Sequence, residues 1–128
     1  LCREELSYIE KSRLKHFSMR DLRRHDVRED VRLVRRAVSD FARLYVTIDM
    51  DVVDPGFAPG VGNPEPDGMW PDLCFSLLTG LCDDRLAGLD LVELSPPCDN
   101  GVTAALGAKM VFEAICASEA ARSKSEGK

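Results

Sequence analysis

A short apolar run that ends in two aspartates is the feature that most constrains how this chain can fold. Residues 44–48 read Leu-Tyr-Val-Thr-Ile and are followed by turn-forming residues, a pattern that predicts a buried strand. Asp49 and Asp51 come at its end. Because alternate side chains of a strand point the same way, we expect the two carboxylates to project together. Adjacent carboxylates repel each other, so the pair predicts either a divalent cation site or an acidic turn.

A long loop stiffened by proline and glycine follows the two aspartates. Residues 52–71 contain five prolines and four glycines, which excludes a helix or an interior strand over most of this segment. Proline reduces the entropy lost when such a loop is ordered, and long ordered loops often carry function. Within the loop, we expect Asp54 to form a turn and, secondarily, to support a neighbouring site.

Strand and helix patterns alternate along the chain, as judged from hydrophobic periodicity and capping residues. The predicted strands are residues 14–18, 44–48 and 88–94. The predicted helices are residues 27–41, residues 71–82, and a last helix that begins at a cap, Asp99 or Asn100, and runs to about residue 117. Residues 1–118 form one predicted domain, and residues 119–128 form a polar tail that we expect to fray. Alternating strands and helices predict a parallel sheet, whose ligands bind beyond the carboxyl ends of the strands.

Glu93 lies near the carboxyl end of the predicted strand over residues 88–94. We therefore expect its carboxylate at the same edge of the sheet as Asp49 and Asp51. The alternative is an ordinary surface glutamate at the end of a strand. Asp90, earlier on the same strand, is predicted to be structural and hydrogen-bonded to a loop.

Charge is unevenly distributed along the sequence. Residues 1–43 carry a net charge of +4, and residues 44–128 carry −9. The negative field of the second part suits cations. The arginines of the first part alternate with acidic residues, which predicts a solvated helix face and not a nucleic-acid-binding surface. The acidic residues concerned are Asp21, Asp26, Glu29 and Asp30.

Composition excludes several other classes of protein. No apolar run approaches the roughly 20 residues of a membrane span. The five cysteines include no Cys-x-x-Cys pair, so neither a zinc site nor a disulfide framework is predicted. Reduced thiols are typical of the cytoplasm or an organelle matrix.

The segment over residues 47–68 resembles a signature of the ureohydrolase family, the arginases and agmatinases. It reads Thr-Ile-Asp-Met-Asp, followed at fixed spacings by Pro55, Pro59-Gly60 and Gly68. Residues 15–21, 88–99 and 103–106 resemble the flanking strands and the start of the last helix of the family. The similarity covers about residues 5–118 and is greatest to the agmatinase branch. It implies a three-layer α/β/α fold with a mainly parallel sheet, of which this chain is the carboxyl-terminal half.

The resemblance also implies a function. Family members use two Mn²⁺ ions to hydrolyse guanidino compounds to urea and an amine. Asp49 and Asp51 match metal ligands, Glu93 matches the glutamate that binds the substrate guanidinium, and Asp54 and Asn63 would support them. The implied partner is a small cationic guanidino substrate. A homo-oligomer is expected at full length, in the cytoplasm or the mitochondrial matrix, with neither nucleic acid nor membrane as a partner.

Two departures from the family pattern limit this implication. The Gly-Gly-Asp-His and Asp-Ala-His-x-Asp motifs, which supply the other metal ligands, do not occur, and the only histidines are His16 and His25, in unrelated contexts. We therefore expect at most a partial metal site, and no activity from this chain alone. In the loop, Val61, Asn63 and Asp67 replace the usual two threonines and a glycine, which bears on substrate choice and activity.

Two alternatives stay open at this point. The Asp-x-Asp pattern also resembles that of the haloacid dehalogenase phosphatases, in which Asp49 would be the nucleophile and Asp51 the acid/base, with Mg²⁺. Asp83-Asp84 and Lys109 could complete that site, although their order along the chain is wrong. The other alternative is a non-catalytic remnant of a ureohydrolase that cannot close a metal site.

Overall fold

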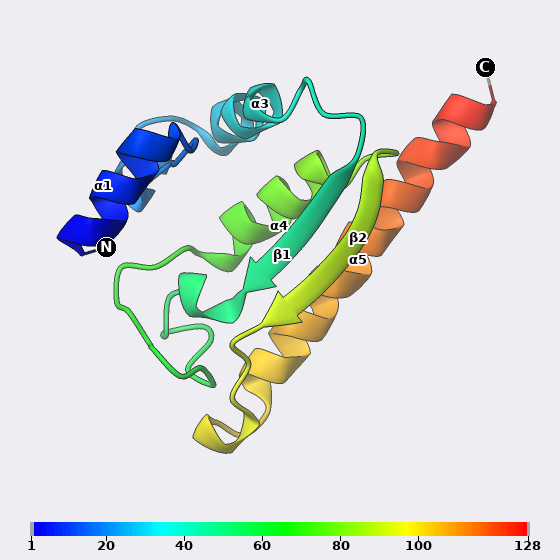
Figure 1. Ribbon diagram of the computed structural model, residues 1–128. Helices are drawn as coiled ribbons and strands as arrows, with labels where there is room; N and C mark the ends of the chain where they lie inside the picture. The colour runs from blue at the N-terminus through cyan, green and yellow to red at the C-terminus, as the bar shows by residue number, and fades with distance from the viewer. Residues whose placement is uncertain (1, 128) are drawn as a thin grey trace.

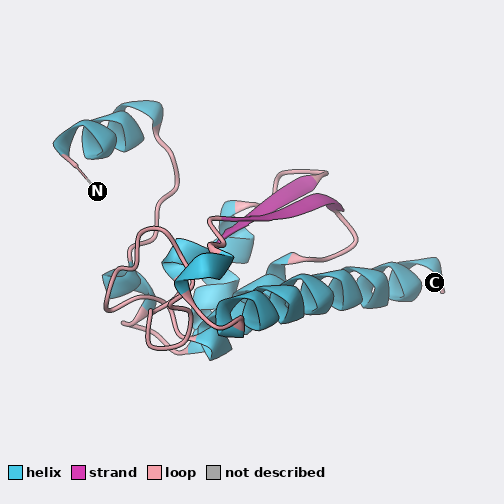
Figure 2. Cartoon of the chain, turned by 90° about the horizontal axis from the view of Figure 1, so that it is seen from below, coloured by secondary structure: helices cyan, strands magenta, loops and turns pink. Residues whose placement is uncertain are grey.

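Two parallel strands with helices packed on one face form the centre of the molecule (Figures 1 and 2). The computed structural model describes residues 2–127. The elements in chain order are α1 (Arg3–Ser12), α2 (Met19–Leu22), α3 (Val27–Ala37), β1 (Leu44–Asp49), the 3₁₀ helix η1 (Met50–Val52), α4 (Pro71–Leu81), β2 (Leu86–Val92), the 3₁₀ helix η2 (Pro96–Cys98) and α5 (Val102–Glu126).

The core lies between the sheet and the helices α4 and α5. Ile48 of β1 packs with Leu78 of α4 and Met110 of α5, and Met110 is completely buried. Burying each such side chain contributes roughly 2 kcal/mol. The opposite face of the sheet is open, because Tyr45 on that face is 67% exposed. The predicted α/β class with parallel pairing is confirmed, but residues 2–127 cover only one face of the sheet, not the two faces of a three-layer fold.

The predicted strand over residues 14–18 is wrong. This segment is irregular and connects α1 to α2, and α1 itself was not predicted. An isolated strand leaves its backbone N–H and C=O groups unpaired, and the sheet of residues 2–127 contains only β1 and β2. No strand of residues 2–127 pairs with this segment, so it does not form part of the sheet.

The helix predicted over residues 27–41 ends earlier, at Ala37, for a long-range reason. The guanidinium of Arg85 donates hydrogen bonds to the carbonyl oxygens of Val38 (2.7 Å) and Phe41 (3.1 Å). These bonds hold the chain after α3 as a loop, in which Phe41 is 59% exposed. Asp83 accepts hydrogen bonds from the same guanidinium, and this interaction raises the pKa of Arg85 and lowers that of Asp83.

One face of α3 also differs from expectation. The acidic residues of this region were predicted to lie on a solvated face, yet Asp30 is only 1% exposed. Asp26 is the exposed N-cap of the helix, and its side chain accepts the N–H of Glu29 at 2.9 Å. The alternation of basic and acidic residues thus predicted the helix, but it did not predict that Asp30 is buried.

The later elements follow the prediction more closely. The helix α4 begins with Pro71 at its first position, as predicted, although Trp70 supplies no side-chain cap. The strand β2 ends at Val92 because Glu93 has φ 61°, a left-handed conformation that cannot continue a strand. The expected frayed tail is instead helical, since α5 continues to Glu126 and Ser118 is buried in it.

Within residues 2–127, no helix combines the length and the apolar character that a membrane span needs. All five cysteines are free thiols. Burial raises the pKa of the Cys74 thiol to about 12, which keeps it protonated and makes it a packing residue.

We expect Gly68→Ala to destabilise the fold, because a Cβ at this position would lie 2.6 Å from the backbone nitrogen of Asp54. Backbone atoms cannot rotate away from such a contact, so we expect a loss of about 1–3 kcal/mol in the free energy of unfolding, measured by urea titration. The matched control is Gly62→Ala in the same loop, where the nearest atom is 4.0 Å away. Equal stability of the two variants would contradict this account of the loop.

Candidate active site

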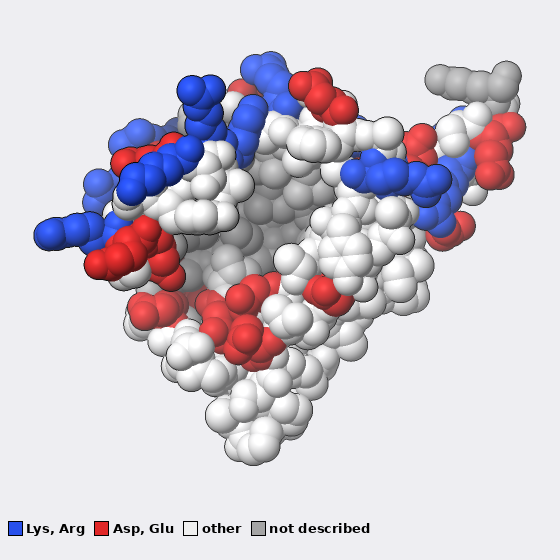
Figure 3. Space-filling model, viewed as in Figure 1, with Lys and Arg blue, Asp and Glu red and all other residues white. Residues whose placement is uncertain are grey.

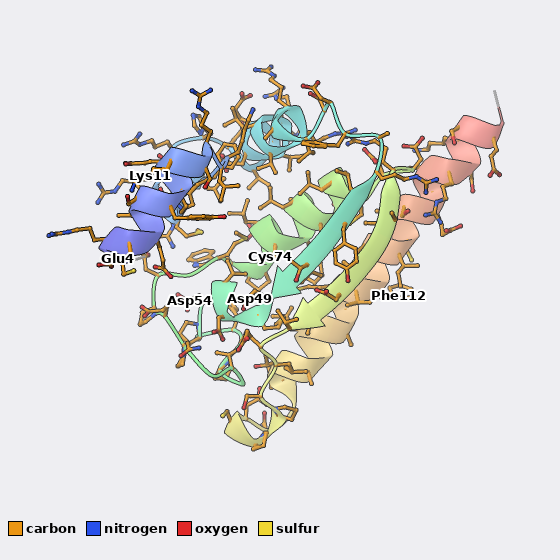
Figure 4. The ribbon with its side chains drawn as sticks, viewed as in Figure 1. Glu4, Lys11, Asp49, Asp54, Cys74 and Phe112 are labelled. Carbon is orange, nitrogen blue, oxygen red and sulfur yellow. The ribbon has the colours of Figure 1, made fainter. Side chains whose placement is uncertain are left out.

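The two aspartates of the motif lie at the carboxyl end of β1, but not both on the strand. Asp49 is the last residue of β1, and Asp51 lies within η1. The carboxylate of Asp49 accepts the backbone N–H of Asp51 at 2.9 Å, and this bond caps the 3₁₀ turn. The expectation that strand alternation aligns the two side chains is therefore wrong, because the backbone turns after Asp49. Figure 4 shows Asp49 at this end of β1, with Asp54 in the loop that follows.

Asn63, in the long loop after η1, hydrogen-bonds to Asp51. Its backbone N–H donates to Oδ1 of Asp51 at 3.4 Å, and its side-chain amide donates to Oδ2 at 3.1 Å. Both carboxylate oxygens of Asp51 are thus held by one residue. Asn63 was expected to support the aspartates, and the structure places it against one of them.

Asp54 organises the loop between η1 and α4. Its carboxylate accepts the backbone N–H groups of Gly56 (2.8 Å), Asp67 (3.0 Å) and Gly68 (3.2 Å). Its own N–H donates to the carbonyl oxygen of Met69 at 3.0 Å. The predicted turn role of Asp54 is confirmed by these bonds, which join the two ends of the loop.

The substitution at Asp67 has a structural partner. Asp67 has φ 70°, in the left-handed region that favours glycine. Its carboxylate forms an ion pair with Arg23, whose guanidinium also donates to the carbonyl oxygens of Asp67 (3.0 Å) and Gly68 (3.1 Å). Arg23 thereby ties α2 to the loop and offsets part of the cost of a non-glycine residue in this conformation.

Glu93 lies one residue beyond β2, at the same end of the sheet as Asp49. The register of the strands pairs Asp49 with Val92, the residue before Glu93. A carboxylate oxygen of Glu93 would lie 4.0 Å from a Cβ built on Gly62. The exposed carboxylate thus faces the loop that carries Asn63. The predicted placement of Glu93 at the edge of the aspartates is consistent with this geometry.

A buried polar contact fixes the loop to α5, and the sequence did not reveal it. The backbone N–H of Gly60 donates to the hydroxyl of Thr103 at 2.7 Å, and Thr103 is completely buried. Asp99 accepts the N–H groups of Gly101 and Thr103, both at 2.8 Å. Hydrogen bonds from the Thr103 backbone, its hydroxyl and Gly101 lower the pKa of Asp99. The predicted cap at Asp99 or Asn100 is wrong, because the N-cap residue is Gly101, although Asp99 accepts the N–H of Thr103 in the first turn of the helix.

Asp90 is structural, as predicted, but its partner lies on a strand and not on a loop. The hydroxyl of Tyr45 on β1 donates to Asp90 at 2.8 Å across the open face of the sheet. The hydroxyl of Thr47, opposite Asp90 in the register, and that of Tyr45 lower the pKa of Asp90. Of these two hydroxyls, only that of Tyr45 has hydrogen-bonding geometry, so we attribute the anchoring to it.

Acidic side chains gather around the carboxyl end of β1, whereas basic ones lie mostly over α1 and α3 (Figure 3). Such a field attracts cations. Carboxylate oxygens suit a hard divalent ion, yet within residues 2–127 no three His, Cys, Asp or Glu side chains come together to hold one. Asp49 and Asp51 thus offer oxygen donors, but the described residues do not provide a complete metal site.

The geometry argues against the phosphatase alternative. Asp83 precedes β2, at the end of the strands opposite to Asp49, and it pairs with Arg85 at 2.9 Å and Arg35 at 3.6 Å. Lys109 is exposed on α5 and pairs with Glu113 at 2.5 Å. Neither the acidic pair nor the lysine approaches the aspartates in the way that this chemistry requires.

Removing the Thr103 hydroxyl should destabilise the chain without changing its shape. In Thr103→Val, the buried N–H of Gly60 loses its acceptor, and we expect a loss of about 1–3 kcal/mol in the free energy of unfolding. Thr79→Val is the matched control, because the exposed Thr79 hydroxyl bonds only within its own helix. Thermal and urea unfolding measure both variants. A Thr103→Val protein as stable as its control would show that the loop is anchored elsewhere.

Comparison with known proteins places these features in a family. The sequence profile of the Arginase family matches residues 1–117. The guanidinopropionase of Pseudomonas aeruginosa is 51% identical over 82 residues, which are 62% of this chain and 26% of that protein. The agmatinase of Neisseria meningitidis serogroup B is 38% identical over 90 residues, which are 70% of this chain and 29% of that protein.

A solved structure supports the same assignment. The proclavaminate amidino hydrolase of Streptomyces clavuligerus superposes with a TM-score of 0.81 at 31% identity, over 88% of this chain and 37% of the other. The chain thus spans about a quarter to two fifths of the length of these proteins. The match over residues 1–117 shows that the chain belongs to the arginase family.

Proposed function

We propose that the carboxyl ends of β1 and β2 form part of a site that hydrolyses a small guanidino compound to urea and an amine. The observation that carries the proposal is the position of Asp49, Asp51 and Glu93 at one edge of the sheet, at or just beyond the ends of two strands whose register pairs Asp49 with Val92. The names of the relatives, a guanidinopropionase and an agmatinase, support a guanidino substrate. Because the chain matches only part of each relative, the activity of the whole site is part of the proposal.

The metal that we propose for this site is manganese. Asp49 and Asp51 offer the oxygen donors that hard divalent ions prefer, and the remaining ligands must come from outside residues 2–127. When bound, the metal supplies an activated water for attack on the guanidinium carbon.

The side chains of this chain have separate tasks in the proposed site. Glu93 binds and orients the guanidinium, since carboxylate and guanidinium form a charge-assisted pair. Asn63 occupies one lone pair on each oxygen of Asp51 and so fixes the direction of the others. Asp54 does not reach the reacting atoms; it holds the loop that carries Asn63.

The isolated 128-residue chain should not turn over a guanidino substrate. Two aspartates cannot hold two manganese ions, and residues 2–127 offer no further cluster of ligands. The measurement is urea release from agmatine, arginine, 3-guanidinopropionate and 4-guanidinobutyrate with added Mn²⁺. The P. aeruginosa guanidinopropionase, assayed in parallel on 3-guanidinopropionate, is the positive control. Metal-dependent turnover by this chain at a comparable rate would refute the partial-site proposal.

The role of Glu93 can be tested after this chain replaces the matching segment of the P. aeruginosa guanidinopropionase. We expect Glu93→Gln to lower kcat/KM by about 10- to 100-fold, the effect of one charge-assisted bond, with unchanged manganese content. Asp49→Asn should instead lower the manganese content. Glu65→Gln is the matched control, because Glu65 is an exposed glutamate in the loop between η1 and α4. If Glu93→Gln instead lost its manganese and kept normal substrate affinity, Glu93 would be a metal ligand and not the residue that binds the substrate.

A further inference from the structure

A cavity separate from the strand ends lies between α2, the start of α3 and the start of α4. Its volume is about 370 Å³, within the lower range of small-molecule sites. None of Asp49, Asp51 and Glu93 lines it. A ligand of this cavity is therefore bound apart from the strand ends.

The floor of the cavity holds a buried carboxylate with an incomplete set of partners. The side chain of Asp30 is 2% exposed, and its Oδ1 accepts no hydrogen bond within residues 2–127. The Nδ1 atom of His25 lies 3.5 Å from that oxygen, and the His25 side chain is 41% exposed. Burying a carboxylate is costly unless hydrogen bonds and an opposite charge compensate it. Asp30 lies in the first turn of α3, whose helix dipole supplies part of this compensation.

The walls of the cavity combine apolar surface with further negative charge. Leu22 and Leu73 are buried and line it, and the indole of Trp70, 60% exposed, forms part of its rim. Asp72 also lines the cavity, and within residues 2–127 its carboxylate accepts only the N–H of the adjacent Leu73. Arg23 is occupied by its ion pair with Asp67. Two carboxylates are thus left to attract a cation.

We propose that this cavity binds a small organic monocation with an ammonium or guanidinium head and a short alkyl body. The head displaces the His25 ring and donates hydrogen bonds to Asp30, which gains the partners that it lacks. The alkyl body lies against Leu22 and Leu73, and the Trp70 indole contacts the cation through its π face. A metal ion fits this cavity less well, because residues 2–127 contain no cluster of three metal-ligating side chains.

The test uses the 128-residue chain and three probes of the same shape: n-butylammonium, n-butylguanidinium and neutral n-butanol. Titration calorimetry should show binding of at least one cation, with n-butanol at least tenfold weaker. Asp30→Asn should weaken cation binding about tenfold or more, which corresponds to roughly 1.4 kcal/mol or more. The matched control is Asp40→Asn, whose exposed carboxylate lies on the loop after α3 and whose affinity should be unchanged.

Nuclear magnetic resonance locates the bound cation without a substitution at the buried acid. Adding n-butylammonium to the unaltered chain should shift the Trp70 indole N–H and the Leu73 methyl signals, and Trp70→Ala should weaken binding several-fold even if Asp30→Asn does not fold. Equal affinity for n-butanol, or no binding of either cation, overturns the proposal. So does loss of binding in Glu93→Gln with binding retained in Asp30→Asn, which would place the cation at the strand ends.

Discussion

The carboxylate of Asp54 is the interaction on which the geometry of the candidate site depends. Proline and glycine allow the loop after η1 to take many turns, but they do not select one. Asp54 selects one conformation of the loop, because its two carboxylate oxygens accept N–H groups from both near and distant residues. The near one is Gly56, and the distant ones are Asp67 and Gly68. With the ends joined, the middle of the loop is held against α5 through Gly60 and Thr103. The loop is therefore held near both of its ends and in its middle. From this fixed loop, the short side chain of Asn63 reaches Asp51.

Features encoded by neighbouring residues were predictable from the sequence, whereas features that depend on distant partners were not. The apolar run before Asp49 and the proline that begins α4 identify β1 and α4 almost to the residue. Residues 14–18 have the composition of a strand, but pairing requires a second strand that a local pattern cannot supply. The early end of α3 likewise depends on Arg85, far along the chain. The candidate acids were identified by their spacing, but the turn that takes Asp51 off the strand was not, because that turn depends on the hydrogen bond from the Asp51 N–H to the Asp49 carboxylate, which residue spacing does not reveal.

The departures from the family pattern are accommodated in different ways. Asp67 takes a conformation suited to glycine and is compensated by Arg23, so this substitution has a partner in α2. Asn63 stands where the family has a threonine, yet it still directs hydrogen-bond donors at an aspartate. The amide N–H groups of Asn63 donate to the carboxylate of Asp51 and leave its other lone pairs available to a cation. Both substituted residues thus have partners within this chain, Asp51 for Asn63 and Arg23 for Asp67.

Exposure limits what the three carboxylates can do within this chain. Asp49 and Glu93 are exposed, and the sheet face that carries Tyr45 and Thr47 is open. In water, two unit charges about 4 Å apart attract by only about 1 kcal/mol, whereas the same pair in a partly covered site attracts by about 4 kcal/mol. Burying these acids would therefore strengthen their attraction for a guanidinium or a metal ion more than adding another exposed acid would. Polypeptide packed over the open face of the sheet would exclude this water. It would thereby strengthen the attraction between these carboxylates and a cation, even if it contributed no ligand.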